Sequence, residues 1–95
     1  MHYIIHCLDK AGALPVRLAH YDAHKAYLAQ PAVDIVVSGP LLAPDGETMI
    51  GSFFLVEADS MAKVQSFHRE DPFFAAGIWE RAEIHPFSKR MDNRA

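Results

Sequence analysis

The order in which β-rich and helix-forming stretches alternate along the chain constrains the fold more than any other feature. Four stretches rich in β-branched and aromatic residues predict strands, at residues 2–8, 33–38, 49–57 and 78–87. Two stretches of helix formers lie between them, at residues 16–30 and 60–70, each closed by a proline. A cap at Asp59 or Ser60 starts the second helix, and residues 73–77 add one short turn after it. The predicted order is β-α-β-β-α-β.

This order is the split βαβ pattern of the ferredoxin-like fold, in the α+β class. Because the two middle strands form a hairpin and helices make the other connections, the sheet is antiparallel and both helices cover one face. The opposite face needs a cover wherever its residues are apolar, and a second copy of the chain supplies one. We therefore expect an α+β domain that forms a homodimer.

Length and charge limit the domain organisation and the partners. The 95 residues suffice for a single domain, 1–95, whose last residues, about 88–95, are typical of a polar tail. The chain has 9 Lys plus Arg and 12 Asp plus Glu, a net charge of −3, which opposes the neutralisation of phosphates. The apolar start of the chain is interrupted by His6 and closed by Asp9, too short to span a bilayer. We expect neither nucleic acid nor a membrane as partner.

The single cysteine, Cys7, lies within an apolar run and has no second cysteine with which to form a disulfide. This context is typical of a buried, inert thiol rather than a nucleophile. It fits a reducing compartment, and we expect the protein to be cytoplasmic.

The first helix presents two stripes of different character. The polar stripe, spaced by three, four and three residues, consists of Arg17, His20, His24 and Tyr27. The small apolar stripe consists of Val16, Ala19, Ala23 and Ala26. We expect the apolar stripe to contact the sheet and the polar stripe to lie along the sheet's edge or at the mouth of a cleft. A solvated face with incidental histidines is an equally open interpretation.

Metal binding is the first chemistry to consider, because His20 and His24 have the i, i+4 spacing of two ligands on one helix. No glutamate of an HExxH motif lies between them, and the other four histidines are dispersed without ligand spacing. We therefore expect no metal site.

Acid–base catalysis is the second chemistry that these residues suggest. Asp71 precedes Pro72, so its backbone is extended at a helix end and its carboxylate is held in place. A histidine that acts as a general base needs such a partner to set its tautomer and support its charged form, which makes Asp71 the best partner for His24. The alternative is that Asp71 only closes the helix.

The central hairpin carries the remaining candidates. Ser38-Gly39-Pro40 and Gly51-Ser52 supply bends and close backbone approach, either for the hairpin alone or for contact with a ligand. No phosphate-binding loop is present, and Ser52 has no nucleophile-elbow context.

Taken together, these motifs resemble those of the YCII-related (YciI-like) domain family. The matching motifs are Arg17-x-x-x-x-x-x-His24-x-x-Tyr27-Leu28, Ser38-Gly39-Pro40-Leu41, Asp45-Gly46, Gly51-Ser52 and Asp71-Pro72-Phe73-x-x-x-Gly77. Each is weak, but their order and spacing are specific, and the resemblance extends from Tyr3 to Pro86-Phe87. The chain departs from the family pattern at His6 and His20, and the roles of these two residues are open.

The resemblance implies a dimeric α/β barrel of ferredoxin-like domains and an active site that pairs His24 with Asp71. It also implies acid–base or elimination chemistry on small cyclic or phenolic compounds. The leading hypothesis is a small cofactor-free enzyme, lyase- or isomerase-like, in which His24 takes a proton and Asp71 orients it. The expected substrate contacts are Arg17, Tyr27, Ser38, Gly39, Ser52 and Phe73. The alternative is a non-catalytic small-molecule-binding or dimerisation module, because no strong nucleophile or cofactor motif is present.

Overall fold

The computed structural model describes residues 1–94. The strands are β1 (His2–Asp9), β2 (Asp34–Leu42), β3 (Met49–Glu57) and β4 (Trp79–Phe87). The helices are α1 (Leu14–Ala19), α2 (Tyr21–Ala29), α3 (Met61–Arg69) and α4 (Pro72–Ala75). The order is thus β-α-α-β-β-α-α-β, which confirms the predicted sequence of strands. The first predicted helix is divided into α1 and α2, whereas α3 and α4 correspond to the predicted second helix and the short turn after it.

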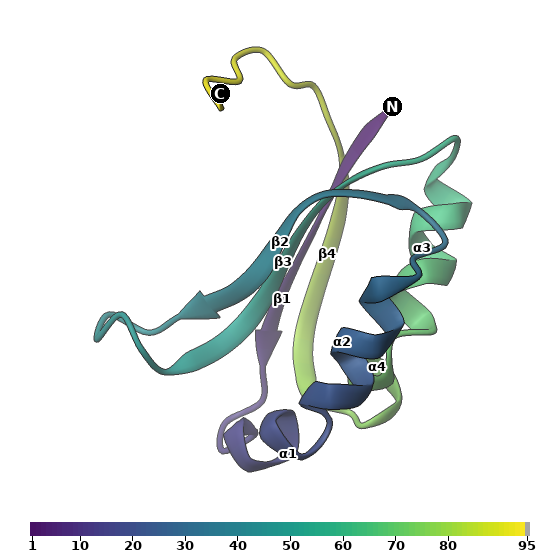
Figure 1. The fold of residues 1–95 in the computed structure, drawn as a ribbon. Helices are drawn as coiled ribbons and strands as arrows, with labels where there is room; N and C mark the ends of the chain where they lie inside the picture. Colours follow the sequence, from purple (N-terminus) through teal and green to yellow (C-terminus); the bar gives the residue numbers. More distant parts are fainter. Residues whose placement is uncertain (95) are drawn as a thin grey trace.

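The four strands form one antiparallel sheet in the order β2-β3-β1-β4, and the helices lie on one side of it (Figure 1). This arrangement confirms the α+β ferredoxin-like fold. Strand alternation explains it locally: Tyr3, Ile5 and Cys7 of β1 point towards the helices and are buried. On β3, Phe54 and Val56 pack with them against α3, so the core lies between the sheet and the helices.

The prediction of one helix over residues 16–30 is wrong. The chain breaks at His20, whose backbone (φ −105°, ψ 7°) ends α1 and begins α2. The prediction that the apolar stripe contacts the sheet is also wrong: its members, Val16, Ala19, Ala23 and Ala26, are all exposed. Arg17 and His24 are buried instead, because each finds an acidic hydrogen-bond partner in the body of the domain, and a polar side chain can be buried when it is hydrogen-bonded.

The region after the hairpin follows its sequence signals closely. Ser60 caps α3, and its side chain accepts a hydrogen bond from the backbone N–H of Lys63. Asp71 has extended backbone (φ −65°, ψ 132°) and caps α4, which begins at Pro72. The Asp71-Pro72 pair therefore both ends one helical segment and begins the next.

The predicted bend at Gly39-Pro40 is wrong, because β2 continues through both residues to Leu42. A proline is tolerated there because β2 is the edge strand of the sheet. Gly51 on β3 has a stricter role: a Cβ at this position would collide with the backbone carbonyl oxygen of Cys7 on β1.

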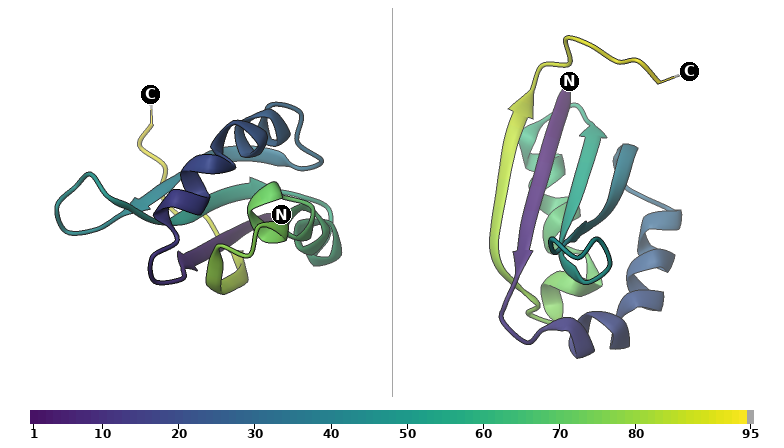
Figure 2. Two further views of the ribbon diagram at one scale, coloured as in Figure 1. Left: turned by 90° about the horizontal axis from the view of Figure 1, so that it is seen from below. Right: turned by 90° about the vertical axis from the view of Figure 1, so that its left-hand side faces the viewer.

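The other face of the sheet carries no helix among residues 1–94, and the right-hand view of Figure 2 looks onto it. We call it the open face. On β1, Ile4 and Leu8 alternate with the buried residues and point to this side. On β3, Phe53 lies opposite His6 and Leu55 lies opposite Ile4, so both point to the same side. All four are half-buried within a single chain. The open face is thus largely apolar at its centre.

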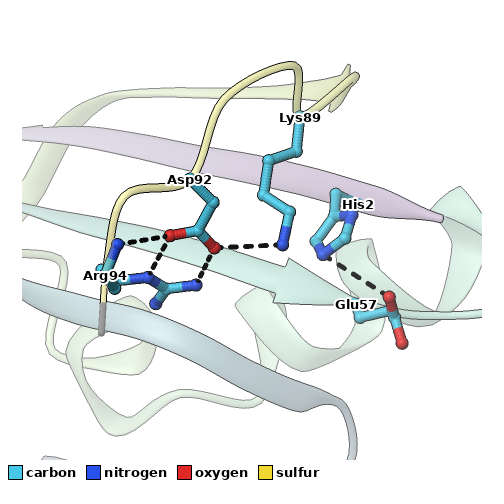
Figure 3. A network of polar contacts seen from close by, with 5 residues as sticks. All are labelled: His2, Glu57, Lys89, Asp92 and Arg94. Atoms are coloured by element: carbon cyan, nitrogen blue, oxygen red, sulfur yellow. Dashed lines mark hydrogen bonds and ion pairs between the residues drawn. The ribbon is translucent and has the colours of Figure 1, made fainter.

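The tail beyond β4 forms no helix or strand over residues 88–94. The charges of the tail pair with one another, since the Asp92 carboxylate accepts hydrogen bonds from Lys89 and Arg94 (Figure 3). In the same region, His2 of β1 and Glu57 of β3 pair across the two strands. None of the helices in the described part of the chain has the length and apolar character needed to cross a bilayer.

Candidate functional site

A cavity of about 250 Å³ lies between the first two helices and the β2–β3 hairpin. Its lining consists of Arg17, Tyr21, His24, Lys25, Leu28, Ser38, Gly39, Pro40, Ser52 and Phe54. Ligand pockets commonly measure about 300–1,000 Å³, so this cavity suits a molecule of about one ring.

His24 and Asp71 form a buried pair at the wall of the cavity. His24 Nδ1 lies 2.8 Å from Asp71 Oδ1, and the two residues are 7% and 1% exposed. An ionised carboxylate only accepts hydrogen bonds, so Nδ1 carries a hydrogen and donates a hydrogen bond to Asp71. Nε2 is then the ring nitrogen left for a molecule in the cavity, with its lone pair free while the ring is neutral.

The positions of both side chains are fixed by further contacts. Asp71 Oδ1 also accepts a hydrogen bond of 2.9 Å from the backbone N–H of Phe73, as the cap of α4. The His24 ring stacks on the Phe73 ring at a centroid distance of 3.9 Å and an interplanar angle of 9°. Phe54 meets the same imidazole edge-on at 6.1 Å. The orientation of the imidazole is therefore set before any ligand arrives.

Arg17 is the second fixed polar group. Its Nε and Nη2 donate to the two carboxylate oxygens of Asp9 at 2.8 Å each, and Nη2 also donates to Ser52 Oγ at 2.8 Å. The guanidinium carbon lies 4.8 Å from the centre of the Phe73 ring. Arg17 is 2% exposed, and its Nη1 takes part in none of these hydrogen bonds. Because Ser52 accepts from Arg17, its own hydroxyl proton is free to be donated to a ligand.

The structure brings most of the predicted site residues together. Arg17, His24, Ser38, Gly39 and Ser52 all line the cavity, and Asp71 lies directly behind His24.

Two predicted substrate contacts lie elsewhere. Tyr27 is outside the lining, and its hydroxyl donates to the backbone carbonyl of Phe67 at 2.8 Å. Burial, reinforced by the charges of Glu70 and Asp71, raises the pKa of Tyr27 to about 12, so its hydroxyl stays protonated. Phe73 is also outside the lining and fully buried, where it supports both His24 and Arg17.

Sequence reasoning missed several residues of the site. The role of Asp9 had no local signal, because its partner Arg17 lies eight residues away across a loop. Tyr21 could have been found from its helical spacing, because it lies three residues before His24 on the same helix face, and Lys25 lies four residues after Tyr21.

The two helix histidines do not act together. His20 is exposed at the junction of α1 and α2, whereas His24 is buried and bonded to Asp71. Over residues 1–94, no group of three or more His, Cys, Asp or Glu side chains is arranged to hold a metal ion.

Burial raises the pKa of the Cys7 thiol to about 12, so this cysteine stays protonated in the core.

Comparison with known proteins places this geometry in a family. The model of the YCII-related domain matches residues 1–88. The chain is 32% identical to protein YciI of Escherichia coli O6:H1, covering 94% of this chain and 98% of that one. It is 27% identical, with the same coverage, to a protein of Haemophilus influenzae.

A solved structure is similar over nearly the whole chain. It is the 5-chloro-2-hydroxyhydroquinone dehydrochlorinase (TftG) from Burkholderia phenoliruptrix AC1100 in complex with 2,5-dihydroxybenzoquinone. The two share 36% sequence identity with a TM-score of 0.84, over 93% of this chain and 94% of that one. From the family match and these similarities, the chain belongs to the YCII-related domain family.

Proposed function

We propose that this protein is an enzyme that performs acid–base or elimination chemistry on a small hydroxylated ring compound, with His24 as the base. The observation that carries the proposal is the buried His24–Asp71 pair, whose Nδ1–Oδ1 distance is 2.8 Å and whose imidazole lines a cavity of one-ring size. A histidine held by a carboxylate through one nitrogen, with the other facing a cleft, has the arrangement that general-base catalysis requires.

In the proposed elimination, the ring compound reacts as its diketo tautomer, in which two ring hydroxyls have become carbonyls and the carbon that carries the leaving group is saturated. His24 Nε2 takes a proton from a ring C–H of this tautomer, between a carbonyl carbon and the carbon that carries the leaving group. The electron pair of that bond forms a C=C bond with the neighbouring carbon, and the leaving group departs with its own electron pair as an anion. His24 later releases the proton to solvent. Asp71 holds the imidazole of His24 in position and stabilises its protonated form. Its Oδ2 is buried without a hydrogen-bond partner among residues 1–94, so the negative charge of the carboxylate is directed to His24.

Negative charge develops on the carbonyl oxygen as the C–H bond breaks. The Ser52 hydroxyl and Arg17 Nη1 are donors next to the cavity that can stabilise it, and both are held in place before the reaction. We assign the role of oxyanion donors to these two groups. Ser38 and Gly39 of β2 form the opposing wall.

The similarity to TftG supports this proposal, because that enzyme is a dehydrochlorinase of a hydroxylated ring and its structure holds a dihydroxybenzoquinone. Loss of chloride with a proton is an elimination of the kind described above. The similarity supports the class of reaction and the size of the ring.

The test is turnover of 5-chloro-2-hydroxyhydroquinone and related halogenated ring compounds, followed by release of halide. We expect His24→Gln to lower the rate by at least about 100-fold, the contribution typical of a positioned general base. His20→Gln is the matched control, since His20 lies one turn earlier, is exposed and does not line the cavity.

Full activity of the His24→Gln variant would contradict the proposed role. Saturable binding of these compounds to the wild-type protein without any product would favour the alternative, a non-catalytic small-molecule-binding module.

We also propose that a second copy of the chain covers the open face, because its apolar centre is otherwise left to water. Sedimentation equilibrium of Leu55→Glu tests this, and we expect a shift towards monomer. Leu18→Glu is the control, because Leu18 is 54% exposed on α1, on the helix side of the sheet. Equal dimer content in both variants would refute the proposal.

We propose, finally, that residues 1–95 act as one domain in the reducing cytoplasm. The free, fully buried Cys7 suits such a compartment. Fusion to a fluorescent protein tests the location, and export of the fusion would contradict it.

A further inference from the structure

We propose that Lys25 and Tyr21 form an anion-binding subsite at the mouth of the cavity, which selects ring compounds that carry a carboxylate or an ionised hydroxyl. The inference rests on the proposed ring-binding function of the cavity and adds a specificity determinant to it. It assigns a role to two lining residues that the proposed chemistry does not use.

The charge of the lining favours an anionic ligand. Two cations, Arg17 and Lys25, line the cavity, and no carboxylate does. The two buried carboxylates that contact lining residues are already engaged, Asp9 by Arg17 and Asp71 by His24. An anionic group that enters therefore meets positive charge without a facing carboxylate.

Lys25 is held near the mouth of the cavity without a strong ion pair. Its ammonium lies 4.8 Å from the centre of the Tyr21 ring, one helical turn earlier, in a cation–π contact. Its nearest acidic partner is Asp22, at 3.8 Å, and the two side chains are 57% and 98% exposed. Such an exposed pair contributes little, so the ammonium can turn to a ligand at small cost.

The two cations lie at different depths. Arg17 is 2% exposed and immobilised by Asp9 and Ser52, whereas Lys25 is more than half exposed on a long flexible side chain. A ring with its reacting edge at the buried His24 thus directs its far edge towards the exposed Lys25. The Tyr21 ring adds an aromatic surface beside that edge.

The experiment measures binding of a charged and an uncharged probe by isothermal titration calorimetry. The probes are 2,5-dihydroxybenzoate and 2,5-dihydroxybenzamide, which share the hydroquinone ring and differ in the charge of one substituent. In Lys25→Gln we expect the affinity for the benzoate to fall about 2- to 5-fold, the size of one partly exposed charge contact, and the affinity for the benzamide to stay unchanged. Added salt should weaken benzoate binding to the wild-type protein more than to Lys25→Gln.

Two variants sharpen the result. Lys25→Arg keeps the charge and should retain the preference for the benzoate. Lys63→Gln is the matched control, because Lys63 is 59% exposed, pairs with Asp59 at 3.0 Å one helical turn away, and lies on α3 outside the cavity lining.

The outcomes separate the two proposals. Equal losses for both probes in Lys25→Gln, or no loss for either, overturn the subsite and leave the ring-binding cavity in place. If neither probe binds the wild-type protein, the ring-binding function and the subsite fail together.

Discussion

The Arg17–Asp9 pair offers the sharpest test of how the site is held together. Arg17 makes two hydrogen bonds to Asp9 and one to Ser52, all at 2.8 Å, and the side chains of the ion pair are 2% and 6% exposed. Arg17→Met keeps the aliphatic part of the side chain and leaves the Asp9 carboxylate buried without its partner. Breaking a buried ion pair in this way costs about 3–5 kcal/mol.

That loss is large for a domain of this size. A chain of 95 residues has a free energy of unfolding of about 5–14 kcal/mol. The single variant is therefore expected to lose about a fifth or more of its stability. In Arg17→Met/Asp9→Leu both charges are gone, and apolar replacement of a buried pair is often nearly neutral. The double variant should thus be more stable than Arg17→Met, with a coupling free energy of at least about 2 kcal/mol.

The assay is equilibrium unfolding in urea, followed by the fluorescence of Trp79, the one tryptophan of the chain. All variants are compared at one protein concentration, because self-association would make stability concentration-dependent. The same cycle on the exposed Lys63–Asp59 pair is the control, with an expected coupling below about 0.5 kcal/mol. A coupling below about 1 kcal/mol for Arg17 and Asp9 would refute the reasoning.

Two further predictions concern stability. Burial holds the pKa of His68 below its ordinary value of 6.5, so the unfolded chain binds the additional proton and the free energy of unfolding falls as pH drops below 6.5. His68→Phe keeps an aromatic ring stacked on Trp79 and should reduce this loss, measured as the urea midpoint at pH 7.5 and 5.5; an identical pH dependence in both proteins would contradict it. Gly51→Ala forces a methyl group against the Cys7 carbonyl and should cost at least about 1–3 kcal/mol. Gly39→Ala, which meets nothing within 4 Å, should cost much less, and equal melting temperatures for the two variants would show the close approach to be unimportant.

The strand and helix order could be read from the sequence because its signals are local. β-branched runs, the cap at Ser60 and the rigid Asp71-Pro72 pair each act within a few residues, and the structure keeps all of them. The pairing of His24 with Asp71 was predictable for a related reason. A carboxylate held at a helix end is a ready partner, and the family motif supplied the histidine.

The sequence by itself thus determined the α+β class and the order of the strands, and together with the family resemblance it predicted the buried contact between His24 and Asp71. Only the tertiary structure decided which stripe of the first helical region faces inward, because burial of Arg17 depends on Asp9, a residue of another element. It also decided that Gly39-Pro40 continues an edge strand, and that Lys25 lines the cavity while Tyr27 does not. These features depend on contacts with residues distant along the chain, and a local sequence pattern does not reveal the energies of such contacts.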